Sequence, residues 1–257
     1  MKLFKIILNA FPRPLLIKLS YVAKPFIAFY LKGNQYTDPI DGKSFRKFLP
    51  YGYRNQRANV LSPSTLSLER HRLLWLYLKN ETDFLNPTQN SKLNVLHMAP
   101  EQCFLKRFQK LKHQYITADL NSPIADVKAD ITNLPFKDNS FDVIFCNHVF
   151  EHIPDDAKAM QELYRVMKKG GMGIFQIPLD PNRTKTFEDD SITDPDERTQ
   201  IFGQYDHVRV YGLDYFEKLR LNGFKVEEIN YSKKLSPELI DRYRLMKDEI
   251  IPVVYKD

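Results

Sequence analysis

The chain has 257 residues, of which 43 % are hydrophobic and 27 % charged, a composition that is typical of globular proteins and excludes disordered and fibrous chains. Its two cysteines, Cys103 and Cys146, form no C-x-x-C pair, so the sequence indicates no disulfide framework, and we expect a cytoplasmic protein. The net charge of +6 lies entirely within residues 1–37, and the balanced remainder has no basic stripe of the kind that binds nucleic acid.

Residues 1–37 form a basic and apolar arm. Its apolar runs, LFKIILNAF and LLIKLSYVAKPFIAFYL, are interrupted by Lys18, Lys24 and Pro25, so we expect a helix but no membrane span. We favour a helical lid that packs on the following domain with its lysines in solvent. The alternative is peripheral contact of residues 1–32 with the inner face of an anionic membrane, which a basic amphipathic helix would make.

The next region, residues 38–82, begins with two turn-like pairs, Asp38-x-x-Asp41 and Ser62-x-x-Thr65. Cysteines at these four places would form a zinc knuckle. Oxygen side chains at this spacing bind zinc poorly, so we expect the segment to fold without metal and the chain to hold no metal site.

Residues 67–80, SLERHRLLWLYLKN, carry an apolar stripe and predict a helix. We expect Arg70, His71 and Arg72 on its solvated face, with contact to a ligand as the alternative.

From residue 92 onwards, short apolar runs alternate with helical patterns. Such alternation predicts βαβ units and a parallel sheet, which binds ligands outside the carboxyl ends of its strands. One helix is expected to begin near Pro154 and to end at Gly170, after a run of basic residues. The predicted strands are residues 92–98, 114–120, 125–131, 140–149, 171–179 and 250–256. A second helix is predicted over residues 103–112, and residues 212–231 predict a helix, a Gly turn and a strand.

Two segments of this region, ADITNLPFKDNSFDVIFCNHVFEHIPD and ELYRVMKKGGMGIFQIP, resemble class I S-adenosylmethionine-dependent methyltransferases of the ubiquinone- and menaquinone-biosynthesis type. The resemblance implies an α/β, Rossmann-like, seven-stranded, mostly parallel sheet with helices on both faces, in a domain over residues 83–257. It also implies S-adenosyl-L-methionine as cofactor. SLERHR, HMAPEQ and FGQYDHVRVYG extend the resemblance to a branch whose cofactor loop reads HxAPE and whose members have cysteines where this chain has its two turns.

The resemblance also assigns cofactor contacts. Asp119 would bind the two ribose hydroxyls, Asp130 would meet the adenine amino group, and His148 would lie beside the methyl group. The alternative for each aspartate is a turn or a helix cap. The residues expected at the cofactor are His97, Ala99, Glu101, Asp119, Leu120, Asp130, Ile131, Asn147 and His148.

The first cofactor loop departs from the usual glycine-rich turn. LHMAPEQC contains no glycine, although glycine lets the backbone approach a ligand closely. Ala99 is small, Pro100 removes an amide donor, and Glu101 would bind the cofactor's ammonium group.

The stretch 186–212 is a long connection of the kind that closes over an acceptor. If DHVRVY is a strand, His207, Arg209 and Tyr211 share one face and could bind an anionic acceptor. The alternative is a hairpin in which acids such as Glu188 pair with Arg209. We expect His148 and His207 to act as bases, with His152, Arg209 and Tyr211 at the acceptor.

Two function hypotheses follow. The first is methyl transfer to a small-molecule or lipid-like acceptor. The second is a non-catalytic binding or scaffold protein on the same fold, which the lost glycines and cysteines favour. The balanced charge beyond residue 37 argues against a nucleic acid as substrate.

Overall fold

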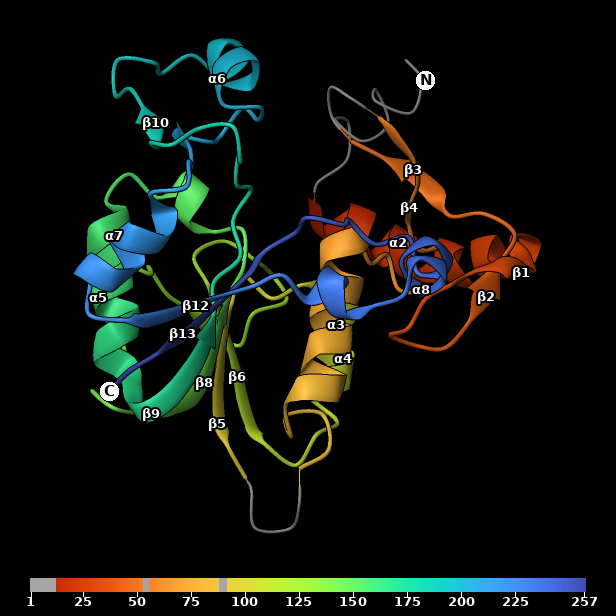
Figure 1. The fold of residues 1–257 in the computed structure, drawn as a ribbon, viewed down its shortest axis with the longest axis horizontal. Coiled ribbons are helices and arrows are strands. Elements are labelled where there is room, and N and C mark those ends of the chain that lie inside the picture. The colour runs from red at the N-terminus through yellow and green to blue at the C-terminus, as the bar shows by residue number, and fades with distance from the viewer. Residues whose placement is uncertain (1–12, 53–55, 88–91) are drawn as a thin grey trace. The chain divides into compact units, whose positions relative to one another are not determined.

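The structure, a computed structural model, describes residues 13–52, 56–87 and 92–257, with side chains from Val22 onwards (Figure 1). These residues form two compact units. One runs to Tyr77 and includes Ser232–Lys247; the other holds Leu78–Tyr231 and Asp248–Asp257. The division of the sequence at residues 37 and 82 stays a prediction, and part of the arm, residues 1–12, lies outside the described residues.

The second unit is built on a seven-stranded sheet in the order β12-β13-β9-β8-β5-β6-β7. Strand β13 runs antiparallel to β12 and β9, whereas β9, β8, β5, β6 and β7 run parallel. This sheet confirms the predicted mostly parallel, Rossmann-like fold and its antiparallel last strand. The strands are β5 (Asn94–Met98), β6 (Gln114–Asp119), β7 (Val127–Lys128), β8 (Phe141–Cys146), β9 (Met167–Ile174), β12 (Lys225–Ile229) and β13 (Ile251–Tyr255).

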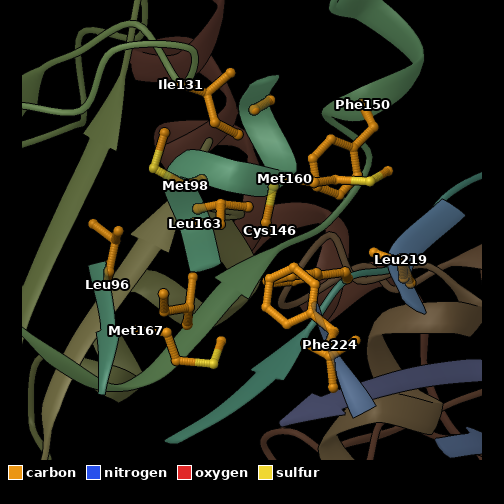
Figure 2. Close-up of a cluster of buried hydrophobic side chains, with 14 of the residues drawn as sticks. Leu96, Met98, Ile131, Cys146, Phe150, Met160, Leu163, Met167, Leu219 and Phe224 are labelled. Atoms are coloured by element: carbon orange, nitrogen blue, oxygen red, sulfur yellow. The ribbon is translucent and has the colours of Figure 1, made fainter. Parts of the chain in front are cut away.

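Helices cover both faces of this sheet because its central strands are apolar on both sides. On one face, Leu96 and Met98 of β5 pack with Met160 and Leu163 of α5 (Asp156–Val166), and helix α7 (Tyr215–Leu221) joins the same core (Figure 2). On the other face, Phe108 of α4 (Gln102–Phe108) lies 5.2 Å from the ring of Phe145. Each such fully buried side chain contributes roughly 1.5–3 kcal/mol.

Helix α5 ends earlier than its sequence predicts. It begins after the N-cap Asp155, whose side chain accepts the backbone N–H of Lys158, and it ends at Val166. The basic residues that follow belong to β9, where Lys168 pairs with Asp142 of β8 at 2.8 Å. Gly170, with φ +71°, lies inside this strand and does not stop the helix.

Between β9 and α7 the chain forms a small outlying layer. Strands β10 (Phe187–Glu188) and β11 (Arg209–Val210) pair antiparallel, and helix α6 (Pro195–Ile201) lies between them in sequence. The 3-10 helix η1 (Phe150–His152) follows β8 and contacts β11.

The first unit contains helices α2 (Arg13–Tyr30), α3 (Glu69–Glu81, whose last turn belongs to the other unit), α8 (Pro237–Arg242) and the 3-10 helix η2 (Tyr231–Lys234). It also contains two antiparallel strand pairs, β1 (Lys32–Thr37) with β2 (Ser44–Phe45) and β3 (Leu49–Tyr51) with β4 (Arg57–Leu61). Its small core is made by Leu31, Tyr36, Phe45 and Phe48.

The two predicted turns of the knuckle-like segment meet through hydrogen bonds. The buried carboxylate of Asp38 accepts from the Thr65 hydroxyl at 2.5 Å and from the Ser67 hydroxyl at 3.1 Å. Asp41 turns away and caps its own turn by accepting the backbone N–H of Lys43. A carboxylate–hydroxyl cluster thus connects the two turns directly.

His71 and Arg72 of helix α3 are buried and Arg70 is partly buried, so the expectation of a solvated face was wrong. Arg72 is fully buried, and its guanidinium donates to the backbone oxygens of Val60, Ser67, Tyr243 and Arg244. A buried arginine needs such acceptors to offset desolvation. They come from β4 and from the segment after α8, which the local sequence does not reveal.

Helix α2 confirms the helical part of the predicted arm over residues 13–30. Its last turns expose Val22, Phe26, Phe29 and Tyr30, with 65–82 % of each side chain accessible. Among the described residues, no helix is both long and apolar enough to cross a membrane.

Candidate functional site

The candidate site lies at the carboxyl ends of β5, β6 and β8. The chain runs outward from β5 to β6 and β7, then returns to place β8 on the other side of β5. Loops on the two sides of such a reversal diverge and leave a crevice, which is where open parallel sheets bind ligands. Ala99, Asp119 and Asn147 follow these three strands directly or end them.

The glycine-free loop after β5 adopts a backbone conformation that glycine favours. Ala99 has φ +46°, in the left-handed region, and its N–H donates to the oxygen of Ala118 at 2.9 Å. A non-glycine residue in this region is strained by roughly 1–2 kcal/mol. The loop therefore keeps the sharp turn of a glycine-rich loop with the smallest side chain that has a Cβ.

A chain of hydrogen bonds fixes the residues behind this loop. His97, fully buried, contacts the Tyr115 hydroxyl through Nδ1 at 2.7 Å and the Glu101 carboxylate through Nε2. Asn147 donates to Glu101 at 3.1 Å and accepts the N–H of Gln176 at 3.2 Å. Because a carboxylate only accepts, Nε2 of His97 carries the proton. His97 thus positions Glu101, and its own contact with the cofactor stays a prediction.

Asp119 and Asp130 each shape a turn with one oxygen. Oδ1 of Asp119 accepts the N–H groups of Asn121 and Ser122 at 2.7 and 2.5 Å. Oδ1 of Asp130 accepts from the N–H and hydroxyl of Thr132, both at 2.8 Å, and these bonds lower the pKa of Asp130. Among the described residues, Oδ2 of neither aspartate accepts a hydrogen bond. The turn therefore leaves one oxygen of each carboxylate for a ligand.

The neighbours of the two aspartates differ in exposure. Leu120 is half exposed, whereas Ile131 is 4 % exposed and packs in the main core. Any cofactor contact of Ile131 would therefore use its backbone.

His148 and Glu151 lie together just after β8. His148 has φ +55°, and its Nδ1 lies 3.2 Å from Oε1 of Glu151. Non-glycine residues held in this region cluster at functional sites. Burial opposes ionisation of Glu151, but the hydrogen bond and charge of His148, with the charge of His152, lower its pKa overall. Glu151 is therefore a buried anion beneath His148.

His152 and His207 meet on the other side of Glu151. Their ring centroids are 4.7 Å apart, with the planes nearly perpendicular. Nδ1 of His152 lies 3.3 Å from Oδ2 of Asp206, and Nδ1 of His207 lies 3.2 Å from the oxygen of Phe202. Burial lowers the pKa of His207, so its ring is neutral near pH 7. The fold thus gathers three of the predicted site histidines, 148, 152 and 207, around one carboxylate.

Arg209 and Tyr211 point inward. Arg209 is 4 % exposed; it donates to the backbone oxygens of Phe150 and Pro154 and pairs with Glu188 at 2.8 Å. The fully buried Tyr211 donates its hydroxyl to Asp156 at 2.7 Å. The pairing with Glu188 matches the structural alternative from the sequence. Acceptor binding by Arg209 and Tyr211 stays a prediction.

Two polar residues at the site escaped the sequence reasoning. Glu151 belongs to the VFEHI segment after β8, and Gln176 lies two residues after the end of β9; both are about 1 % exposed. Oε2 of Glu151 and both side-chain polar atoms of Gln176 are buried without a hydrogen-bond partner among the described residues. Buried polar atoms are rarely left unsatisfied, so these atoms point to a ligand. The sequence signal that could have identified Glu151 and Gln176 was their position just after two strands that are adjacent and parallel in the sheet.

Comparison with known proteins identifies the region that carries the site. Residues 85–175 match the family model described as a methyltransferase domain, which covers β5 to β9. The 2-phytyl-1,4-naphtoquinone methyltransferase of Nostoc punctiforme is 31 % identical over 136 residues, 49 % of this chain and 46 % of that protein. The demethylmenaquinone methyltransferase of Staphylococcus epidermidis is 45 % identical over 58 residues, 23 % of this chain and 24 % of that protein.

The chain thus spans less than half the length of these relatives.

Among solved structures, YcgJ of Bacillus subtilis is 18 % identical with a TM-score of 0.48, covering 72 % of this chain and 98 % of that one. An S-adenosylmethionine-dependent methyltransferase of Mesorhizobium loti is 13 % identical with a TM-score of 0.44, covering 71 % of this chain and 96 % of that one.

Proposed function

We propose that the class I methyltransferase domain of this chain transfers a methyl group from S-adenosylmethionine to a small-molecule acceptor. The observation that carries the proposal is the placement of Ala99, Asp119, Asp130 and His148 after β5, β6, β7 and β8, on the matched methyltransferase region. The relatives that act on quinones, by their names, support an acceptor of small-molecule size.

The residues of the crevice suit this cofactor. The free oxygen of Asp119 would accept from the ribose hydroxyls, and Asp130 would accept from the adenine amino group. Glu101, held by His97 and Asn147, would face the ammonium group. The unsatisfied amide of Gln176 supplies a further donor and acceptor beside Asn147.

The cofactor supplies an activated methyl group on its sulfonium. The chain's part is to hold the acceptor in line with that methyl group, to exclude water and to take any proton the acceptor must lose. His148 and His207 would remove that proton, and the hydrogen bond of His207 to Phe202 uses Nδ1 and leaves Nε2 for this role. Glu151 would act as a positioning residue, because its carboxylate contacts Nδ1 of His148.

Calorimetric titration with S-adenosylmethionine and S-adenosylhomocysteine tests the cofactor step without knowledge of the acceptor. We expect micromolar binding that is lost in Asp119→Ala. Asp41→Ala is the matched control, because Asp41 makes the same kind of turn in the other unit. No binding at millimolar cofactor would support the alternative, a non-catalytic binding or scaffold protein.

We further propose that the acceptor is lipid-like and is reached at a membrane surface. Helix α2 exposes Phe26, Phe29 and Tyr30 next to an apolar hollow lined by residues that include Ile27, Leu31, Phe48 and Leu49. Residues 1–37 carry the whole net positive charge, which favours an anionic lipid surface as the occupant of this face.

A further inference from the structure

The loop after β8 and the loop before β11 bring together a group of metal-ligand type. One ligand atom each from Glu151, His152 and His207 lies within 4.8 Å of the others. The first two residues are adjacent in η1, and the third comes from a segment more than fifty residues later. The sequence predicted no metal site, because its metal signals were limited to cysteine pairs and knuckle spacing, and these three residues follow neither pattern.

The contacts around the two histidines engage one nitrogen of each ring and leave the other for a ligand. Nδ1 of His207 hydrogen-bonds to the backbone oxygen of Phe202, which only accepts, and Nδ1 of His152 lies 3.3 Å from the carboxylate of Asp206. Because a metal ion binds the deprotonated nitrogen of an imidazole, Nε2 is the candidate ligand atom of each ring. Metal-binding histidines usually donate their other ring N–H to a carboxylate or a backbone oxygen in this way.

Glu151 supplies the charge that such a site needs. Its side chain is about 1 % exposed, and its Oε2 is buried without a hydrogen-bond partner among the described residues. Its other oxygen, Oε1, is already bound to His148. A buried anion with one unsatisfied oxygen beside two imidazole nitrogens is strongly favourable for a cation.

We propose that Glu151, His152 and His207 bind a divalent first-row transition-metal ion, with the remaining coordination positions open to water or acceptor. Two imidazoles and a carboxylate suit Zn²⁺, Mn²⁺, Fe²⁺ and Co²⁺. Tetrahedral ligands about 2.1 Å from zinc lie about 3.4 Å from one another, so closing onto an ion needs side-chain movements of about 1 Å.

The ion also suggests a class of acceptor, an inference that rests on the proposed function. A bound divalent ion holds an oxygen-bearing acceptor and lowers the pKa of its hydroxyl, as it does for water. Nε2 of His207 is then committed to the ion and is not available for the acceptor's proton. An acceptor with an ionisable hydroxyl, such as a phenol or quinol, fits such an ion.

Metal binding is measured on the full chain without cofactor or acceptor. The purified protein is treated with a chelator and titrated with Co²⁺, followed by visible absorption, and with Zn²⁺, followed by calorimetry. We expect about one ion per chain, with the intense visible bands of a low-symmetry cobalt site. His152→Ala and His207→Ala should each weaken binding by at least about 100-fold, and Asp206→Asn by about 10–100-fold because its carboxylate contacts Nδ1 of His152.

His113→Gln is the matched control, because His113 hydrogen-bonds to the backbone of Leu93 and Phe84 away from this cluster. Thermal unfolding of each variant after chelator treatment checks that the fold is retained without metal. The metal site is overturned if the wild-type chain binds neither ion. It is also overturned if both histidine variants bind the ions as tightly as the wild-type chain does. Cofactor binding is measured separately, so the loss of one proposal does not remove the other.

Discussion

Glu162 and Arg165, one turn apart on α5, form a bidentate ion pair in which Nε and one terminal nitrogen of Arg165 lie 2.7 and 2.8 Å from the carboxylate oxygens. The pair also holds the loop before β8. Glu162 accepts the N–H of Leu134, and Arg165 donates to the oxygens of Leu134 and Phe136. The two sequence segments that carried the family resemblance, LPF and ELYRV, are therefore one physical unit.

This pair predicts how stability depends on pH. The hydrogen bonds from Arg165 lower the pKa of Glu162 from its usual 4.5 despite partial burial. A lowered folded-state pKa means that the contribution is present above about pH 4.5 and is lost as the pH falls through the lower folded value. Glu162→Gln should destabilise the protein by about 1 kcal/mol at pH 7 and by less under acid conditions. Urea unfolding at several pH values measures this, and a difference that does not shrink in acid would contradict it.

The left-handed backbone at Ala99 gives a second prediction. Ala99→Gly should leave folding and cofactor affinity intact or improve them, because glycine adopts this conformation without strain. Ala99→Val should lower the free energy of unfolding by about 2 kcal/mol, because a β-branched residue is poorly tolerated at positive φ. The same variant should bind S-adenosylhomocysteine at least about 10-fold more weakly. Calorimetry and thermal unfolding check both variants. Equal affinity of the valine variant would show that this turn does not face the cofactor.

His207 supports a third prediction. His207→Ala should lower turnover by about 100-fold or more while cofactor affinity stays close to wild type, whether the ring acts as a base or as a metal ligand. Methyl transfer from labelled S-adenosylmethionine to a phenolic or quinol acceptor, alongside calorimetry with S-adenosylhomocysteine, separates the two effects. Unchanged turnover would remove His207 from the mechanism.

The sheet was predictable because buried parallel strands are continuous apolar runs, so 92–98 and 140–149 were placed close to β5 and β8. The end of α5 was not predictable, because Lys168 forms an ion pair with Asp142 on the neighbouring strand. In the sequence, a basic residue at a helix end cannot be distinguished from one within a strand. The local pattern of residue types does not reveal a partner so far away in the sequence.

The site was predictable only in part for the same reason. Asp119, Asp130 and His148 were singled out because they end or follow predicted strands, and they do lie at or just after the ends of β6, β7 and β8. The inward direction of Arg209 depends on the backbone oxygens of Phe150 in η1 and of Pro154 just after it, more than fifty residues earlier. The group of Glu151, His152 and His207 likewise exists only once η1 and β11 are neighbours.

The exposed face of α2 gives the last prediction. The full chain should bind vesicles that contain an anionic phospholipid and should bind zwitterionic vesicles weakly, because the apolar side chains insert and the basic arm is attracted to the lipid surface. Raising the salt concentration should weaken this binding, since exposed charges are screened over about 8 Å at physiological ionic strength. Co-sedimentation with vesicles measures both effects.

Substitution of the face separates lipid binding from non-specific adhesion. Phe26→Ser with Phe29→Ser should reduce vesicle binding at least about 10-fold, because each buried phenylalanine contributes roughly 1.5–3 kcal/mol. Leu221→Ser is the matched control: Leu221 is 77 % exposed at the end of α7, in the other unit, and lies outside the basic arm. If the control variant loses as much binding as the double variant, or if anionic and zwitterionic vesicles bind alike, the α2 face is not a lipid-binding surface. The interpretation that the sequence favours, a helical lid packed on the following domain, then accounts for the arm.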